Sequence, residues 1–224
     1  RLRQASARLG APKMDRPEWR GSDPARGEVY CTLTNNSARG TEGRPKVDAA
    51  NPRERNVMGQ IIKWREADDF DATSMHWTHF VLAGDLANER AEARGNVRGD
   101  VFGCPDGLAF DHRGVLWIQT DVGSTSMHRG EFERIGNNQM LAADVRTGEV
   151  RRFLTGPVNA EVTGATFTPD NRTLFVNIQH PGEPPRDRSD PAAPMKYSSW
   201  PDGRGRPRSA TVVIRRVDGG VVGA

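Results

Sequence analysis

The chain has 224 residues, with 32 basic and 29 acidic side chains, a formal net charge of +3 and only 35% hydrophobic residues. Its mean hydropathy is −0.69, and no stretch approaches the roughly 18 apolar residues that a membrane-spanning helix needs. Glycine and proline number 24 and 15, which indicates many turns and argues against a helical bundle or a coiled coil. The basic residues are scattered along the chain, so the sequence does not predict a nucleic-acid-binding protein.

Taken in chain order, residues 1–13 are expected to be the tail of a helix or a linker, and residues 14–224 a β-rich unit. Short apolar and β-branched runs, most of them followed by Gly, Pro, Asn or Asp, predict strands. Polar segments between them, over 39–57, 84–100, 122–138 and 181–208, predict long loops. The predicted strands are 29–34, 60–64, 77–83, 115–120, 140–145, 149–154, 173–178 and 211–217.

One hairpin plan occurs in the segments 17–36, 105–121 and 160–180. In each segment an acidic residue opens the first strand, a polar turn follows, and a polar residue ends the second strand. Repeated sheets of this kind predict an all-β fold, a β-propeller, in which the innermost strands of the blades meet around a central channel. The length suffices for about three to four blades of roughly 40–50 residues each. The acidic residues would then converge at one mouth of the channel.

Converging carboxylates repel each other unless cations hold them, and hard cations such as calcium take roughly six to eight oxygen ligands. Glu18, Asp106 and Glu161 are therefore candidate metal ligands, with Asn35 and Asp121 as helpers. The competing interpretation is that these residue types serve as turn formers, which applies above all to Asp106 in its Pro-Asp-Gly sequence.

Arg16 stands two residues before Glu18, and the alternation of side chains along a strand puts both on one face. An arginine beside metal-bound carboxylates suits a bidentate grip on phosphate. The alternative is an arginine that merely offsets local negative charge. His180, at the end of a second strand, reaches the channel mouth or belongs to a turn, and both Cys31 and Cys104 are expected to be buried and apolar in character.

Several short sequences occur in a fixed order: 14–19 (MDRPEW), 33–36 (LTNN), 104–108 (CPDGL) with 119–121 (QTD), and 159–164 (NAEVTG) with 179–182 (QHPG). Each is weak alone, but the ordered set resembles the C-terminal half of PhoX-type alkaline phosphatases. The resemblance runs from about Ala11 to the end of the chain. It implies a six-bladed β-propeller that hydrolyses phosphate monoesters with calcium (Ca2+) and ferric iron (Fe3+) at the channel.

By this resemblance, Glu18, Asp106 and Glu161 would ligate metal, and Asn35 and Asp121 would join them. Arg16 would contact the phosphate as the catalytic and substrate-binding residue. The implied reaction is metal-assisted in-line attack at phosphorus, with cations and Arg16 offsetting the charge of the phosphoryl oxygens.

The resemblance also implies export of the folded protein by the twin-arginine machinery to the periplasm or the outside of the cell. We expect the protein to be a monomer. The family's iron-ligating cysteine belongs to the upstream half, so neither cysteine of this chain is assigned that role. The chain has no initiator methionine, and we expect it to be a piece of a longer protein. Further ligands would then lie upstream, and the isolated piece is expected to lack activity.

Two other functions fit the same residues. A calcium-dependent lactonase or esterase of the gluconolactonase kind also places Glu, Asn and Asp at a propeller mouth, but it needs one divalent ion and no arginine for phosphate. A non-enzymatic scaffold that binds proteins would use the acidic residues only in turns. Such a scaffold should keep its fold and its metal content when Glu18 is replaced by Ala.

Overall fold

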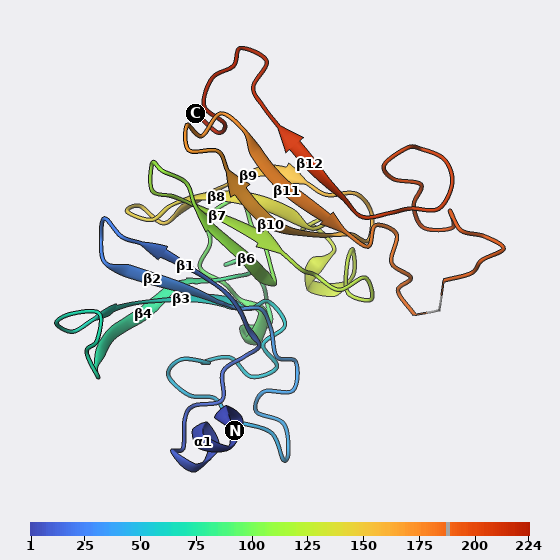
Figure 1. Ribbon diagram of the computed structural model, residues 1–224. Helices are drawn as coiled ribbons and strands as arrows, with labels where there is room; N and C mark the ends of the chain where they lie inside the picture. Colours follow the sequence, from blue (N-terminus) through green and yellow to red (C-terminus); the bar gives the residue numbers. More distant parts are fainter. Residues whose placement is uncertain (187–188) are drawn as a thin grey trace.

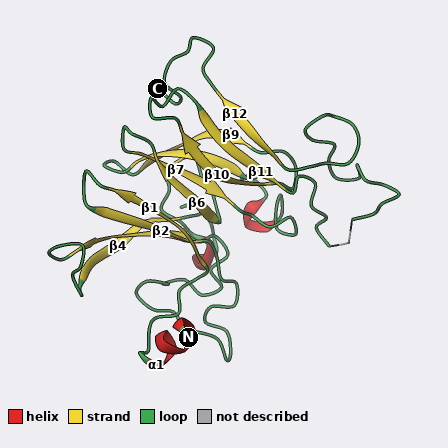
Figure 2. Ribbon diagram, in the orientation of Figure 1, coloured by secondary structure: helices red, strands yellow, loops and turns green. Residues whose placement is uncertain are grey.

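The computed structural model describes residues 1–186 and 189–224. Within these residues the strands form three sheets, while helix is limited to α1 (Leu2–Arg8) and the 3-10 turns η1 (Ala91–Ala93) and η2 (Gly130–Phe132). Figure 2 shows how little helix there is beside the strands. The expected all-β fold class is thus confirmed. None of the helices in this part of the chain has the length and apolar character to cross a membrane.

The three sheets are called here I, II and III in the order in which they occur along the chain. Most neighbouring strands within a sheet are antiparallel and consecutive in sequence. The short strand β5 (Arg98–Gly99) differs, because it pairs in parallel with β9 at the edge of sheet II. Sheet I consists of β1 (Pro17–Asp23), β2 (Glu28–Leu33), β3 (Gln60–Glu66) and β4 (Met75–Leu82). Sheet II also contains β6 (Pro105–Phe110), β7 (Val115–Thr120), β8 (Gln139–Asp144) and β9 (Glu149–Thr155). Sheet III consists of β10 (Glu161–Phe167), β11 (Leu174–Gln179) and β12 (Ala210–Ile214).

The predicted strands all occur, each within one or two residues of its expected start. The prediction over 211–217 is too long at its end, because the strand stops at Ile214 and a turn closed by the Gly219 N–H and the Arg216 carbonyl follows. The first strands of the hairpins, β1, β6 and β10, also form as the repeated plan requires.

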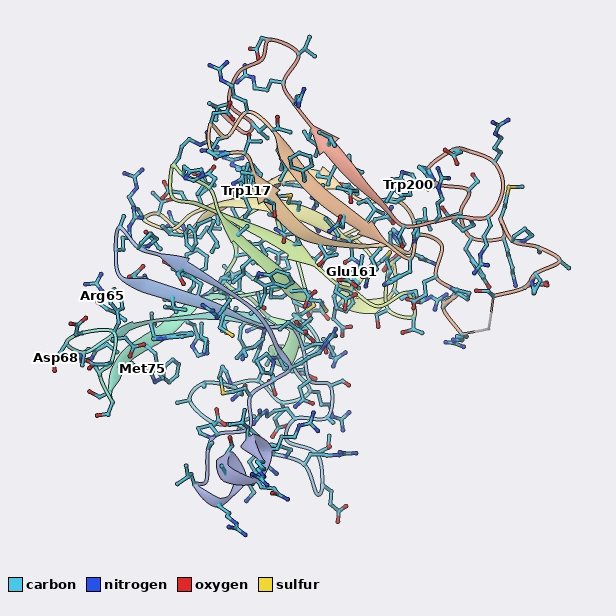
Figure 3. The ribbon with its side chains drawn as sticks, in the orientation of Figure 1. Arg65, Asp68, Met75, Trp117, Glu161 and Trp200 are labelled. Atoms are coloured by element: carbon cyan, nitrogen blue, oxygen red, sulfur yellow. The ribbon has the colours of Figure 1, made fainter. Side chains whose placement is uncertain are left out.

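Apolar side chains fill the space between the sheets in two clusters. Between sheets I and II, Tyr30 packs edge-on against Phe80 and Phe110. Between sheets II and III, the fully buried Trp117 packs against Phe153 and Phe167, and Figure 3 labels it amid the strands. Burial of aromatic rings in such pairs fixes how the sheets face each other.

The first strands of the three hairpins, β1, β6 and β10, are neighbours, because β6 contacts both β1 and β10. Figure 1 shows the sheets spreading away from these strands. Each first strand contains a register shift where it pairs with its second strand: Pro17/Arg20 in β1, Pro105/Leu108 in β6 and Thr163/Thr166 in β10. The three hairpins therefore share a register shift near the start of the first strand.

Candidate active site

Acidic side chains from the sheets meet where the first strands begin. Glu18 and Asp106 are the second residues of β1 and β6, Glu161 is the first residue of β10, and Asp121 directly follows β7. Asp106 and Glu161 lie close enough to act on each other electrostatically. Asp106 also lies close enough to Asp121 and Glu18 to feel their charge. The structure thus brings four of the candidate residues together, and Figure 3 labels Glu161 at the start of β10.

An unusual backbone conformation precedes each of the strand-opening acids. Arg16, Cys104 and Asn159 have φ angles of +50°, +51° and +51°, and each stands two residues before its acid. Residues other than glycine rarely adopt this left-handed conformation, and it is concentrated at functional sites. The three acids therefore share the same local backbone conformation two residues upstream.

Arg16 joins two of the acids. Its Nε donates to Glu18 Oε1 at 2.9 Å, and its Nη2 donates to Asp121 Oδ2 at 2.7 Å. Burial by itself would lower the pKa of Arg16, but the hydrogen bonds and charges of Asp121 and Glu18 outweigh it and raise that pKa. The Arg16 side chain is 41% exposed. Its guanidinium is therefore held by two carboxylates and charged, yet still accessible to an anion.

The other two acids lie in a less favourable electrostatic environment. Burial, followed by the charges of Glu161, Asp121 and Glu18, raises the pKa of Asp106 to about 7. Burial and the charge of Asp121 also raise the pKa of Glu161. One arginine does not offset this concentration of negative charge, and a cation would relieve the repulsion.

The Asn35 side chain contacts Cys104, which precedes Asp106 by two residues. Its Nδ2 is 3.3 Å from Cys104 Sγ, and burial raises the pKa of the Cys104 thiol to about 12. The position equivalent to Asp121 is occupied in sheet I by Thr34, since the Thr34 and Asp121 N–H groups donate to the Arg16 and Cys104 carbonyls. The Thr34 hydroxyl is 3.4 Å from Asp106 Oδ1. The structure therefore places Thr34, rather than Asn35, beside an acid.

Two further residues of sheet III contact Glu161. Gln179 Nε2 donates to Glu161 Oε2 at 2.7 Å, and His180 Nε2 is 3.4 Å from the same oxygen. Gln179 ends the second strand directly opposite the acid. This cross-strand position is the sequence signal that could have identified Gln179.

A pocket of about 330 Å³ lies between the loops that follow β2 and β7. Asn35, Cys104, Gly123, Ser126 and Arg129 are among its lining residues, whereas the four acids of the candidate site do not line it.

The donor chemistry suits hard cations, because carboxylates are the ligands that calcium and similar ions prefer. The arrangement does not amount to a complete ligand set. In the described part of the chain, no group of three or more His, Cys, Asp or Glu side chains is placed to hold a metal ion. The Asp106 and Glu161 pair fits as a partial donor set, and Glu18 and Asp121 are engaged by Arg16.

Comparison with known proteins identifies the family. The family model for alkaline phosphatase PhoX matches residues 1–182. The structure of Pseudomonas fluorescens PhoX in complex with vanadate, a transition-state analogue, matches with a TM-score of 0.84 and 46% identity, covering 100% of this chain. This chain spans only 37% of the length of that one.

Two weaker structural likenesses were also found. A gluconolactonase from Xanthomonas campestris, XC5397, gives a TM-score of 0.39 at 17% identity, covering 74% of this chain and 35% of its own. A luciferin-regenerating enzyme gives a TM-score of 0.38 at 14% identity, and the match covers 72% of this chain and 37% of that one. Likenesses this weak do not establish a shared fold. No curated protein sequence matches the chain. The family model and the 46% identity to PhoX over the whole chain agree, and the chain belongs to the PhoX alkaline phosphatase family.

Proposed function

We propose that this chain carries part of the active site of a metal-dependent alkaline phosphatase that hydrolyses phosphate monoesters. The observation that supports this most is the placement of Arg16 between Glu18 of sheet I and Asp121 of sheet II, next to the Asp106 and Glu161 pair. The 46% identity to a PhoX that binds vanadate, an analogue of phosphoryl transfer, supports the same reaction class.

In this proposal Arg16 binds the phosphate. Its guanidinium is held by two carboxylates, remains charged and is accessible, so it can form a bidentate pair with phosphoryl oxygens. Because the carboxylates fix its position beforehand, little reorganisation is needed when negative charge develops on those oxygens.

Asp106, Glu161, Glu18 and Asp121 would hold Ca2+ and Fe3+, with Asn35 at the edge of the site. These cations supply Lewis-acid stabilisation of the phosphoryl oxygens when they are bound. The raised pKa of Asp106 and of Glu161 supports a cation there, since a positive charge would offset the repulsion that raises these pKa values. Water and other oxygen donors would complete each ligand shell.

Several broader properties belong to the same proposal. Residues 14–224 would form consecutive blades of a β-propeller, since sheets I–III share their strand order, their bulged first strands and their contacts at β6. The protein would act as a monomer in the periplasm or outside the cell, reached by twin-arginine export, where phosphate monoesters are its small-molecule partners.

The test is hydrolysis of p-nitrophenyl phosphate by the intact protein, with metal content measured by elemental analysis. We expect hydrolysis that chelator abolishes, and we expect Arg16→Ala to lose at least roughly tenfold in kcat/KM while it retains metal. Glu161→Gln should lose metal and activity together. Asp170→Asn is the matched control, because Asp170 only caps a turn through Thr168 and Arg172. Turnover of a lactone with calcium alone, or activity that Arg16→Ala leaves intact, would contradict the proposal.

A further inference from the structure

The proposed function leaves one long polar segment without a role. Residues 34–59 join β2 to β3 and are called here the β2–β3 loop. Although it is polar and largely without strand, this loop contains some of the most deeply buried polar side chains of the molecule, among them Arg39, Asn51 and Asn56. Burying so many polar groups is costly unless they are paired, so their partners reveal what the loop does.

The β2–β3 loop encloses the carboxylate of Asp15, which is wholly buried. Asp15 Oδ1 accepts hydrogen bonds from Arg39 Nε at 2.7 Å and from Asn36 Nδ2 at 2.9 Å, and its Oδ2 accepts one from Asn56 Nδ2 at 3.1 Å. The Asp15 backbone N–H donates to Asn51 Oδ1 at 3.0 Å. The loop therefore fixes both the side chain and the backbone of Asp15.

Arg39 is in turn held in place. Its side chain is 1% exposed, its Nη1 donates to the Lys46 carbonyl at 2.7 Å, and its Nη2 donates to the Lys13 carbonyl. Lys13 lies in the segment that leads to Asp15, so Arg39 grips that segment at two points. A buried ion pair with its remaining donors satisfied has one defined geometry, and loss of one partner leaves the other buried and unpaired.

Asp15 directly precedes Arg16, the residue with the left-handed backbone. The Arg16 N–H donates to the Met14 carbonyl at 3.1 Å, and the Arg16 carbonyl accepts from the Thr34 N–H at 3.1 Å. A strained conformation persists only where its surroundings determine it fully. Here the hydrogen bonds of Asp15 hold the backbone before Arg16, and the Thr34 N–H, which follows β2, holds the Arg16 carbonyl.

We propose that Asp15 is a positioning residue for Arg16: enclosed by the β2–β3 loop, it fixes the backbone from which the Arg16 guanidinium reaches Asp121. The inference rests on the proposed function, in which Arg16 binds phosphate. Asp15 itself is wholly buried and does not touch the substrate.

The experiment measures inhibition by inorganic phosphate in the intact, metal-loaded enzyme, together with kcat, KM and metal content. Asp15→Asn preserves shape but removes the charge and turns an amide toward donors. We expect the inhibition constant of phosphate to rise roughly tenfold, and KM with it, while the metal content is unchanged. Asp23→Asn is the matched control, since Asp23 is a buried, arginine-paired acid at the opposite end of β1. It should lower stability and leave phosphate inhibition unchanged, and the same behaviour in Asp15→Asn would overturn the inference.

A double-variant comparison separates positioning from general loss of structure. Arg16→Ala should weaken phosphate inhibition, and adding Asp15→Asn to it should cause no further loss, because the residue being positioned is gone. Losses that add would overturn the inference. If Asp15→Asn does not fold, Asn36→Ala removes one bond to Asp15 and should raise the inhibition constant roughly threefold on its own.

The same data distinguish failure of the inference from failure of the proposed function. If Arg16→Ala leaves phosphate inhibition unchanged, Arg16 does not bind phosphate and both ideas are wrong. If Arg16→Ala weakens inhibition and neither Asp15→Asn nor Asn36→Ala does, only the positioning role of Asp15 is wrong.

Discussion

The candidate site contains two costly features at different residues, left-handed backbone and buried acidic side chains. Arg16, Cys104 and Asn159 share the first feature, and Asp106 and Glu161 share the second. A residue in such a strained backbone conformation costs about 1–3 kcal/mol. The rest of the structure must offset such costs, so neighbouring positions should tolerate little change.

Gly107 shows how tight this region is. It follows Asp106 inside β6, and a Cβ at this position would lie 2.3 Å from Gln119 Oε1 and 3.2 Å from Gln119 Cβ. Gln119 is itself buried and cannot move away without disturbing the strand pair. Gly107→Ala should therefore lower the free energy of unfolding by about 1–3 kcal/mol, measured by denaturant unfolding.

Gly123→Ala is the control for this prediction. A Cβ at Gly123 would have only Thr125 Oγ1 near it, at 4.0 Å, and its φ angle is not in the left-handed region. We expect a change within about 0.5 kcal/mol. Equal effects of the two substitutions would contradict the role assigned to Gly107.

The sequence was informative about acids that face the site and silent about the acid that supports it. Glu18, Asp106 and Glu161 occupy equivalent places in a repeat, so their convergence could be predicted. Asp15 belongs to no repeat, and its partner Arg39 lies 24 residues away in a loop. Burial of such a pair depends on how the loop folds back, which residue types and spacing do not specify. Asp106 was ambiguous for a different reason, since Pro-Asp-Gly suits a turn, yet it lies within β6.

Among the elements, β2 and β3 are tied together by charge as well as by backbone pairing. Glu28 Oε2 accepts from the Tyr30 hydroxyl at 2.7 Å, and Glu28 Oε1 accepts from Lys63 Nζ at 3.1 Å. Burial alone would raise the pKa of Glu28, but these hydrogen bonds and the charges of Lys63 and Arg65 lower it. A carboxyl with a lowered folded-state pKa stabilises the fold above its unfolded pKa, and the contribution is lost as pH falls through the folded-state value.

Glu28→Gln should therefore lower the free energy of unfolding by about 1 kcal/mol at pH 7. The difference from the unsubstituted protein should shrink as the pH drops below about 4.3, the usual pKa of a glutamic acid. Denaturant unfolding at a series of pH values measures both effects. Glu149→Gln, at an exposed pair with Arg151, should change stability little at any pH. A Glu28→Gln effect that is constant with pH would contradict the electrostatic explanation.

Strands were easier to predict than the loops between them. Apolar residues are continuous in runs such as 115–120, and turn residues follow them. A short apolar run with this boundary predicts a strand from local sequence alone. The loops 39–57 and 122–138 have no such period, because their side chains are placed by contacts with distant segments. Asn138, for example, accepts from the Thr120 hydroxyl and donates to the Ala160 carbonyl. Contacts of this kind link sheets II and III and are invisible in a local pattern.

For the molecule as a whole, the candidate site depends on how the sheets are packed, since its acids come from sheets I, II and III. Trp117 lies fully buried between sheets II and III, packs against Phe153 and Phe167, and donates from Nε1 to Asp111 Oδ2 at 3.2 Å. Trp117→Ala would leave a cavity there and remove a hydrogen bond from Asp111. The free energy of unfolding should fall by about 3–5 kcal/mol.

The same substitution should also weaken metal binding, although Trp117 makes no hydrogen bond to the four acids of the candidate site, because Asp106 stands on sheet II and Glu161 on sheet III. A small shift between the sheets separates this carboxylate pair. The measurements are thermal unfolding and metal titration of the intact protein. Phe70→Ala, at an exposed loop position, should alter neither. If Trp117→Ala lowers stability and leaves metal affinity unchanged, the two acids are held by their own strands, and sheet packing does not set the geometry of the site.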